Sequence, residues 1–173
     1  MKRKNRFDNE YQLHIFTQKH LEELFDLECI ASEIQLNRLR LDNLAFDEKT
    51  SSFVIIEYKN ELDLNVLTQA QDYLDLLLEN KEFFLNRLGD DIEVEFENTR
   101  IMIIGPEFSK NQINDAKDNV ELWKITLSDD GVVSYENLKT SEIKVIDIDL
   151  DELKLTEESL LEYKSDENEK TVL

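Results

Sequence analysis

A carboxylate and a lysine stand one residue apart at the end of an apolar run, in the segment FVIIEYK at residues 53–59. Four consecutive apolar residues are typical of a strand that is buried on both faces. Side chains two positions apart on a strand leave from the same face, so Glu57 and Lys59 point the same way. The segment therefore predicts a central strand with a polar pair at its end.

A second carboxylate comes from the segment RLDNLAF at residues 40–46, which is followed by the turn DEKTSS. If the two segments form a hairpin, Asp42 reaches the face that carries Glu57 and Lys59. Two carboxylates and a backbone carbonyl form a hard oxygen site that suits Mg²⁺, and a neighbouring ammonium can hold water or stabilise negative charge on phosphate. The spacing indicates a metal-dependent nuclease.

These residues resemble the PD-(D/E)xK nuclease superfamily, specifically its branch of small prokaryotic proteins related to NucS-type (RecB-like) endonucleases. That branch has a helical glutamate, a segment R-hydrophobic-D-x-L-A-x-D, an apolar strand ending in E-x-K, and a helix with Q-x-x-x-Y. The resemblance covers roughly residues 8–127. The matching residues are Glu10, Arg40, Leu41, Asp42, Leu44, Ala45, Asp47, Glu57, Lys59, Gln69 and Tyr73.

The resemblance implies a restriction-endonuclease-like α/β fold, with a mixed central β-sheet flanked by helices. It implies that Mg²⁺ or Mn²⁺ is bound by Asp42, Glu57 and the backbone carbonyl of Tyr58. Leu41 stands where the superfamily name has proline, which leaves the aspartate in place. The implied activity is hydrolysis of phosphodiester bonds in nucleic acid, more specifically DNA, in defence or repair, with endonuclease and exonuclease action both left open.

Further roles follow from the same resemblance. Lys59 would orient or activate water and stabilise charge in the transition state. Gln69 would face the metal site from its helix and hold a water or a phosphate oxygen. Glu10 has two interpretations, an outer-shell role at the metal or simple electrostatic support of the helix N-terminus. Tyr73, one turn after Gln69, is more typical of packing with a hydroxyl contact.

Other polar residues have structural interpretations. Asp47 is more typical of a turn than of a metal ligand. Glu33 lies on a predicted strand and points either toward the site or toward solvent, and the pattern favours solvent. His14 and His20 lie six residues apart on one predicted helix. That spacing does not place them on a shared face, so we do not predict a zinc site there.

The charge of the chain opposes nucleic-acid binding, because a net charge of −20 repels phosphate. Residues 1–60, however, contain 11 acidic and 9 basic side chains, a net charge of −2. Residues 1–7 form a basic arm that either contacts phosphate or is a solvated terminus. We therefore expect weak binding of nucleic acid by the isolated domain. A catalytically weak or inactive nuclease-fold subunit that binds a protein partner or dimerises, and a DNA mimic, remain alternatives.

The setting is predicted from composition. The single cysteine, Cys29, excludes an internal disulfide, and no apolar run approaches the length of a membrane span. The first residues, MKRKNR, are followed by FDNEYQ rather than by a signal-peptide core. We expect a cytoplasmic protein that does not contact the membrane.

Helical and strand patterns alternate along the chain, which favours an α/β fold. The first helix should begin after an Asp8 cap and bury Tyr11 and Ile15. We divide the chain into a nuclease-like domain, 1–138, and an acidic C-terminal extension, 139–173, that could begin a further module. The predicted helices are about 9–25, 64–88 and 109–118, and a short charged helix within 156–173 is expected to fade into disorder. The predicted strands are 28–36, 38–46, 52–59, 99–105, 120–127 and one within 141–155.

Overall fold

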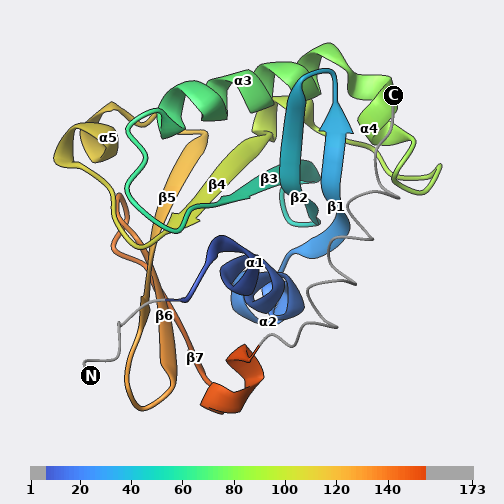
Figure 1. Cartoon of the computed structure of the whole chain (residues 1–173). Coiled ribbons are helices and arrows are strands. Elements are labelled where there is room, and N and C mark those ends of the chain that lie inside the picture. Colours follow the sequence, from blue (N-terminus) through green and yellow to red (C-terminus); the bar gives the residue numbers. More distant parts are fainter. Residues whose placement is uncertain (1–6, 155–173) are drawn as a thin grey trace.

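The computed structural model describes residues 7–154 (Figure 1). Residues 1–6 of the predicted basic arm and the predicted C-terminal helix at 156–173 lie outside the described residues. Within the described part, no helix is long and apolar enough to cross a bilayer.

Within residues 7–154, the strands form one seven-stranded sheet in which neighbours in sequence are neighbours in space. The first three strands are antiparallel, the next two join in parallel, and the last two are again antiparallel. This mixed sheet with flanking helices confirms the predicted α/β class. The strands are β1 (Glu28–Leu36), β2 (Leu39–Asp47), β3 (Ser52–Tyr58), β4 (Arg100–Gly105), β5 (Val120–Leu127), β6 (Val132–Asn137) and β7 (Ile143–Asp147).

Helices cover both faces of the sheet (Figure 1). On one face, α1 (Glu10–Lys19) and α2 (Leu21–Phe25) form a core with alternate residues of β3, including Ile56 and Tyr58. On the other face, α3 (Val66–Glu79) packs on the intervening residues, including Phe53 and Ile55. Every residue of β3 is buried, as its apolar run predicts. The remaining helices are α4 (Lys81–Leu85), α5 (Lys110–Asp115) and the short 3₁₀ helices η1 (Phe96–Asn98) and η2 (Leu150–Leu153).

The first helix differs from its prediction. Asn9, not Asp8, is the N-cap, because the Asn9 side chain accepts the hydrogen bond from the N–H of Gln12 at 2.8 Å. The helix breaks at His20, so α2 is separate. Tyr11, predicted to be buried, is exposed. The residues of α1 that enter the core instead include Leu13 and Phe16, because they pack in one cluster with Leu21 and Leu24 of α2.

The long amphipathic helix is also interrupted. Asn80 separates α3 from α4, and its side-chain amide donates to the carbonyl of Leu76 at 2.8 Å. This side-chain hydrogen bond occupies a carbonyl at the end of α3 and stabilises the break. Near this break Leu77 is buried, whereas the next residue, Leu78, is exposed.

The last two strands complete the sheet. The predicted added strand within 141–155 is present as β7, whereas β6 was not anticipated. β7 pairs with β6 in antiparallel register. The division that the sequence suggested after residue 138 therefore falls inside this sheet, between two of its paired strands.

An ion-pair network holds the end of the sheet where β4 begins. Arg100 Nη1 lies 3.0 Å from Asp47 Oδ2, and Arg100 Nε lies 2.6 Å from Glu121 Oε2. Asp47 Oδ1 also accepts the N–H of Lys49 at 2.9 Å, which confirms Asp47 as a turn residue. Both acids and the arginine are mostly buried, so removing any one of these side chains leaves the charge of its partner poorly solvated.

We expect Asp47→Ala to lower the free energy of unfolding by about 1–3 kcal/mol, since it removes a partner of Arg100 and a turn hydrogen bond. Urea unfolding followed by circular dichroism measures the change. The control is Lys49→Ala, which removes an ion pair between the exposed side chains of Lys49 and Asp26, and which should change stability little. Equal losses in the two variants would contradict a structural role for the network.

Candidate active site

Two carboxylates face each other across neighbouring strands. Asn43 of β2 pairs with Ile56 of β3, so the adjacent residues Asp42 and Glu57 lie opposite one another. Glu57 Oε1 accepts the N–H of Asp42 at 3.0 Å, and Asp42 Oδ2 accepts the N–H of Tyr58 at 2.9 Å. The structure thus brings together the two carboxylates that the sequence placed at one site.

The electrostatics of this pair favour a cation. Burial, followed by the charge of Asp42, raises the pKa of Glu57 well above its ordinary value. Burial also raises the pKa of Asp42, which His14 and the N–H of Tyr58 partly offset. Burial away from water destabilises the charged form of a carboxylate, and at Glu57 the repulsion from Asp42 adds to this effect. A divalent cation bound between them would relieve that repulsion.

Glu33 of β1 adds another carboxylate. Ser32 and Ile34 pair with Asn43 and Leu41, which sets Glu33 level with Asp42. The prediction that Glu33 faces solvent is wrong, because it is 3% exposed. Its backbone has φ +55°, in the left-handed region, so its side chain departs from the simple alternation on which that prediction depended.

The Glu33 carboxylate is balanced by two cationic or potentially cationic groups. Arg40 donates from Nε to Glu33 Oε2, so the motif arginine neutralises this acid. The Nδ1 of His14 lies 3.3 Å from Glu33 Oε1. The His14 ring stacks on Tyr58, with centroids 4.6 Å apart. Its orientation is therefore fixed by an acid on one strand and an aromatic ring on another.

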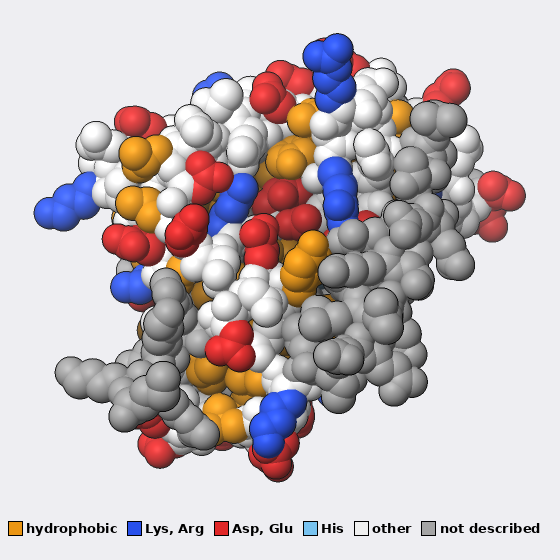
Figure 2. All heavy atoms as spheres, in the orientation of Figure 1, with side chains coloured by type: hydrophobic (Ala, Val, Ile, Leu, Met, Phe, Trp, Pro, Cys, Tyr) orange, Lys and Arg blue, Asp and Glu red, His pale blue; other side chains and the backbone are white. Residues whose placement is uncertain are grey.

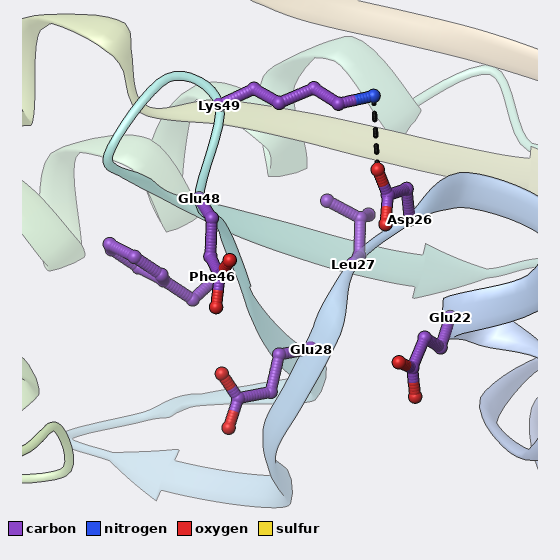
Figure 3. Close-up of a pocket in the computed structure, with 7 residues that line it drawn as sticks. All are labelled: Glu22, Asp26, Leu27, Glu28, Phe46, Glu48 and Lys49. Atoms are coloured by element: carbon purple, nitrogen blue, oxygen red, sulfur yellow. Dashed lines mark ion pairs between the residues drawn. The ribbon is translucent and has the colours of Figure 1, made fainter.

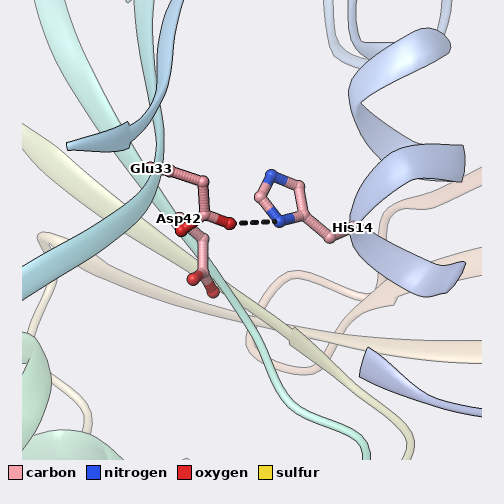
Figure 4. Close-up of side chains that lie close together, drawn as sticks. All are labelled: His14, Glu33 and Asp42. Atoms are coloured by element: carbon pink, nitrogen blue, oxygen red, sulfur yellow. Dashed lines mark ion pairs between the residues drawn. The ribbon is translucent and has the colours of Figure 1, made fainter. Parts of the chain in front are cut away.

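His14, Glu33 and Asp42 form a group with metal-binding geometry. One ligand atom from each lies within 4.8 Å of the others. Figure 4 shows His14 reaching from α1 toward Glu33, with Asp42 beside them. One imidazole nitrogen with two carboxylate oxygens suits a divalent ion such as Mn²⁺. The donor set therefore fits the metal that the resemblance implies.

Sequence reasoning missed His14, which it considered only as a partner of His20. His20 instead lies near Glu23 and Glu152, at 3.3 and 3.6 Å, outside the carboxylate group. The available signal was the spacing of Glu10 and His14, which are four residues apart on one helix face. Glu10 lies at the exposed rim, and its pKa is raised by burial and by Asp42 while Lys59 and His14 oppose the rise.

Lys59 follows β3 directly. Its N–H donates to the carbonyl of Ile104 at 2.8 Å, which extends the contact between β3 and β4. Its ammonium donates to Gln69 Oε1 at 2.9 Å and lies 3.0 Å from Asp63 Oδ2. Lys59 also lowers the pKa of Glu57, so its charge acts on the carboxylate pair.

Residues of α3 and β3 complete the surroundings. Gln69 contacts the site through Lys59. Tyr73, half-buried one turn later, has a pKa raised by burial, then by Glu57 and Asp42, so its hydroxyl stays protonated beside the carboxylates. The hydroxyl of Tyr58 donates to Asn43 Oδ1 at 2.6 Å. The role implied for the Tyr58 carbonyl remains a prediction.

The surface around these residues is strongly acidic. Figure 2 shows acidic side chains spread over one face, with Lys and Arg on both sides of a central acidic group. A separate hollow of about 520 Å³ lies where β1 begins and β2 ends (Figure 3). Lys49 and Asp26 form an ion pair in this hollow at 2.9 Å. None of the predicted site residues lines the hollow, whose lining is Glu22, Asp26, Leu27, Glu28, Phe46, Glu48 and Lys49.

Comparison with known proteins adds one relative by sequence. No protein-family model matches the chain. The chain is 31% identical over 122 residues to an uncharacterized protein of Haemophilus influenzae. That alignment covers 65% of this chain and 40% of the relative, so the chain spans about two fifths of the length of the curated relative.

Three solved structures overlap with the fold. A repair endonuclease from Pyrococcus abyssi is 19% identical, with a TM-score of 0.49, and the match covers 70% of this chain and 49% of that one. EndoMS in a complex with double-stranded DNA is 13% identical, with a TM-score of 0.43 and coverage of 63% of this chain and 40% of that one. Pyrococcus furiosus SfsA in complex with Ca²⁺ is 17% identical, with a TM-score of 0.38 and coverage of 73% of this chain and 62% of that one. Because these TM-scores lie below 0.5, the fold is assigned from the chain's own strand order.

The raised pKa of Glu57 predicts a pH-dependent cost to the metal-free protein. Below the ordinary glutamate pKa of about 4.3, Glu57 is protonated in both the folded and the unfolded state and does not change the free energy of unfolding. Above that pH the free energy of unfolding falls, and it stops falling once the pH exceeds the raised pKa of the folded state. Glu57→Gln keeps an oxygen for the N–H of Asp42 and removes the charge. We expect the variant to melt at higher temperature than the unaltered protein in EDTA at pH 8, with a smaller gain at pH 5.

Differential scanning calorimetry measures this difference, and each kcal/mol gained should raise Tm by about 2–4 °C. Glu48→Gln is the control, because it removes an exposed carboxylate from the turn after β2. A lower Tm for Glu57→Gln at pH 8 would assign Glu57 to a stabilising ion pair.

The imidazole in the donor set predicts that the protein prefers Mn²⁺ to Mg²⁺, which takes oxygen ligands. In calorimetric titrations, His14→Gln should weaken Mn²⁺ binding by at least about tenfold and Mg²⁺ binding less. His20→Gln is the matched control, because it alters the other histidine near the first helix and leaves the carboxylate group intact. Unchanged Mn²⁺ affinity in His14→Gln would exclude this histidine as a ligand.

Proposed function

We propose that this chain is a metal-dependent nuclease domain that hydrolyses phosphodiester bonds in DNA. The observation that carries the proposal is the pairing of Asp42 with Glu57 across β2 and β3, with Lys59 two residues further along. The resemblance of the same residues to the PD-(D/E)xK superfamily gives this geometry its chemical interpretation.

The carboxylates provide the metal centre. Asp42 and Glu57 would hold Mg²⁺ or Mn²⁺ with the Tyr58 carbonyl, and Glu33 and His14 extend the donor set on the side of β1 and α1. When bound, the ion polarises the phosphate and makes water more acidic. The chain's own contribution is to hold these donors in one place before the ion arrives, through backbone hydrogen bonds to both strand carboxylates.

Lys59 provides the positive charge for the reaction. Its ammonium orients the attacking water or stabilises the negative charge that develops on phosphate. Gln69 fixes this ammonium from α3 and keeps an amide group near the phosphate. Glu10, exposed at the rim of the group, would accept hydrogen bonds from water around a bound ion.

The acidic surface limits how tightly the domain binds its substrate. With a net charge of −20, few phosphates are neutralised by basic side chains, so divalent cations must screen the approach of DNA. The same charge favours a second candidate function, in which the domain is an inactive nuclease-fold subunit that binds a basic protein surface. The two functions differ in whether Lys59 and Glu57 are needed for any reaction.

Incubation with plasmid, single-stranded DNA and RNA in Mn²⁺ separates them. We expect cleavage of DNA by the unaltered protein and a loss of about 100-fold or more in rate for Lys59→Ala and for Glu57→Gln. Lys49→Ala is the matched control, because it removes a lysine that pairs with Asp26 outside the site. Intact substrates in every reaction, with Mn²⁺ binding demonstrated by calorimetry, would refute the nuclease proposal and support the interaction subunit.

A further inference from the structure

Lys59 is tied to a loop that the proposed reaction does not otherwise use. This loop, residues 60–65, connects β3 to α3 and contains Asp63. Asp63 Oδ2 lies 3.0 Å from the ammonium of Lys59, and Asp63 Oδ1 accepts the N–H of Asn65 at 2.9 Å. The hydrogen bond from Asn65, and then Lys59, lower the pKa of Asp63, so this carboxylate is charged at neutral pH. One acid therefore links the ammonium to the loop backbone.

Helix α5 also contacts this loop, through the side chain of Gln112. The side chain of Gln112 is buried, at 5% exposure. Its Nε2 donates to the carbonyl oxygen of Asp63 at 2.6 Å, while its Oε1 accepts the N–H of Ser109 at 2.8 Å. Ser109 in turn caps the helix by accepting the N–H of Gln112. The two ends of one amide thus connect the start of α5 to the residue that holds Lys59.

The backbone of Lys59 is fixed as well. Its N–H is bonded to Ile104, and a Cβ added at the next residue, Gly105, would lie 3.2 Å from Lys59 Cβ. Glycine therefore permits the close approach of β4 to Lys59. With the backbone held, the direction of the flexible four-carbon side chain depends on the acceptors around its ammonium, Gln69 and Asp63.

We propose that Asp63 and Gln112 are positioning residues for Lys59. Asp63 holds the ammonium directly, and Gln112 holds Asp63 from α5. The kinetic part of this inference rests on the proposed nuclease function. The two residues lie outside the motif that suggested the function, so they extend the site to a loop and a helix that the motif does not include.

The test uses two variants of the full chain and two matched controls. Asp63→Ala removes the partner of Lys59, and Glu61→Ala removes another carboxylate from the same loop. Gln112→Glu retains the oxygen that caps α5 and replaces the amide that donates to Asp63. Asn111→Asp adds the same charge to an exposed neighbouring position on that helix. Asp63→Ala and Gln112→Glu should lower kcat by about ten- to a hundredfold with little change in KM, and the controls should retain kcat.

A second readout does not require activity. Reductive methylation of amines, followed by mass spectrometry, reports how freely Lys59 reacts relative to exposed Lys110. We expect faster modification of Lys59 in Asp63→Ala and in Gln112→Glu than in their controls, because the first removes one of its two acceptors and the second releases that acceptor from α5. Unchanged modification of Lys59 in both variants would overturn the proposal, whether or not the unaltered protein cleaves DNA. Faster modification without any cleavage would leave the positioning role standing and remove the nuclease proposal alone.

Discussion

The burial of two carboxylates side by side is the constraint on which this site depends. Asp42 and Glu57 are held close together because each accepts a hydrogen bond from the backbone of the opposite strand. Those hydrogen bonds favour the charged form of each carboxylate. Burial opposes it in both, joined by the charge of Asp42 at Glu57 and by the charge of Glu33 at Asp42, so the pKa of each carboxyl is raised. The metal-free protein therefore retains an unfavourable arrangement that a cation would relieve. Such an arrangement is expected where a binding function, rather than stability, sets the residues.

The elements on the two sides of Asp42 and Glu57 contribute different groups. β1 and α1 bring Glu33 and His14, which extend the donor set, and Arg40 balances the added charge. On the other side, α3 and the loop before it carry the acceptors of the Lys59 ammonium. The candidate metal ligands thus gather on one side of Asp42 and Glu57, and the groups that contact the Lys59 ammonium gather on the other. This separation allows the lysine to be fixed without competing for the ligands.

The two ends of the sheet also differ in function. At the start of β4, Arg100 lies between Asp47 and Glu121 in a compensated network. At the end of β3, Asp42 and Glu57 both have a raised pKa, so the surrounding cations compensate their charge only in part. The motif D-x-L-A-x-D spans both ends, which explains why its first aspartate belongs to the site and its second to the turn. Sequence proximity within the motif therefore does not mean a shared role.

Much of this arrangement was determined by the sequence alone. The apolar run of β3 required a buried central strand, and the period of two put Glu57 and Lys59 together. The turn after Asp47 set the hairpin register that brings Asp42 to Glu57. Because these relations involve residues that are close in sequence or on paired strands, local periodicity is enough to predict them. The helical spacing of Gln69 and Tyr73 likewise placed both on the face of α3 that meets the site.

Tertiary structure decided the rest. The left-handed backbone at Glu33 turned its side chain inward, and no periodic pattern predicts such a departure. His14 joined the group because α1 packs through Leu13 and Phe16 rather than through Tyr11, a choice made by contacts with α2 and the sheet. Gln112 reaches Asp63 across 49 residues of sequence. Contacts of this range depend on how complete elements pack together, and for that reason the candidate metal ligands from α1 and β1 and the support of Lys59 are properties of the fold.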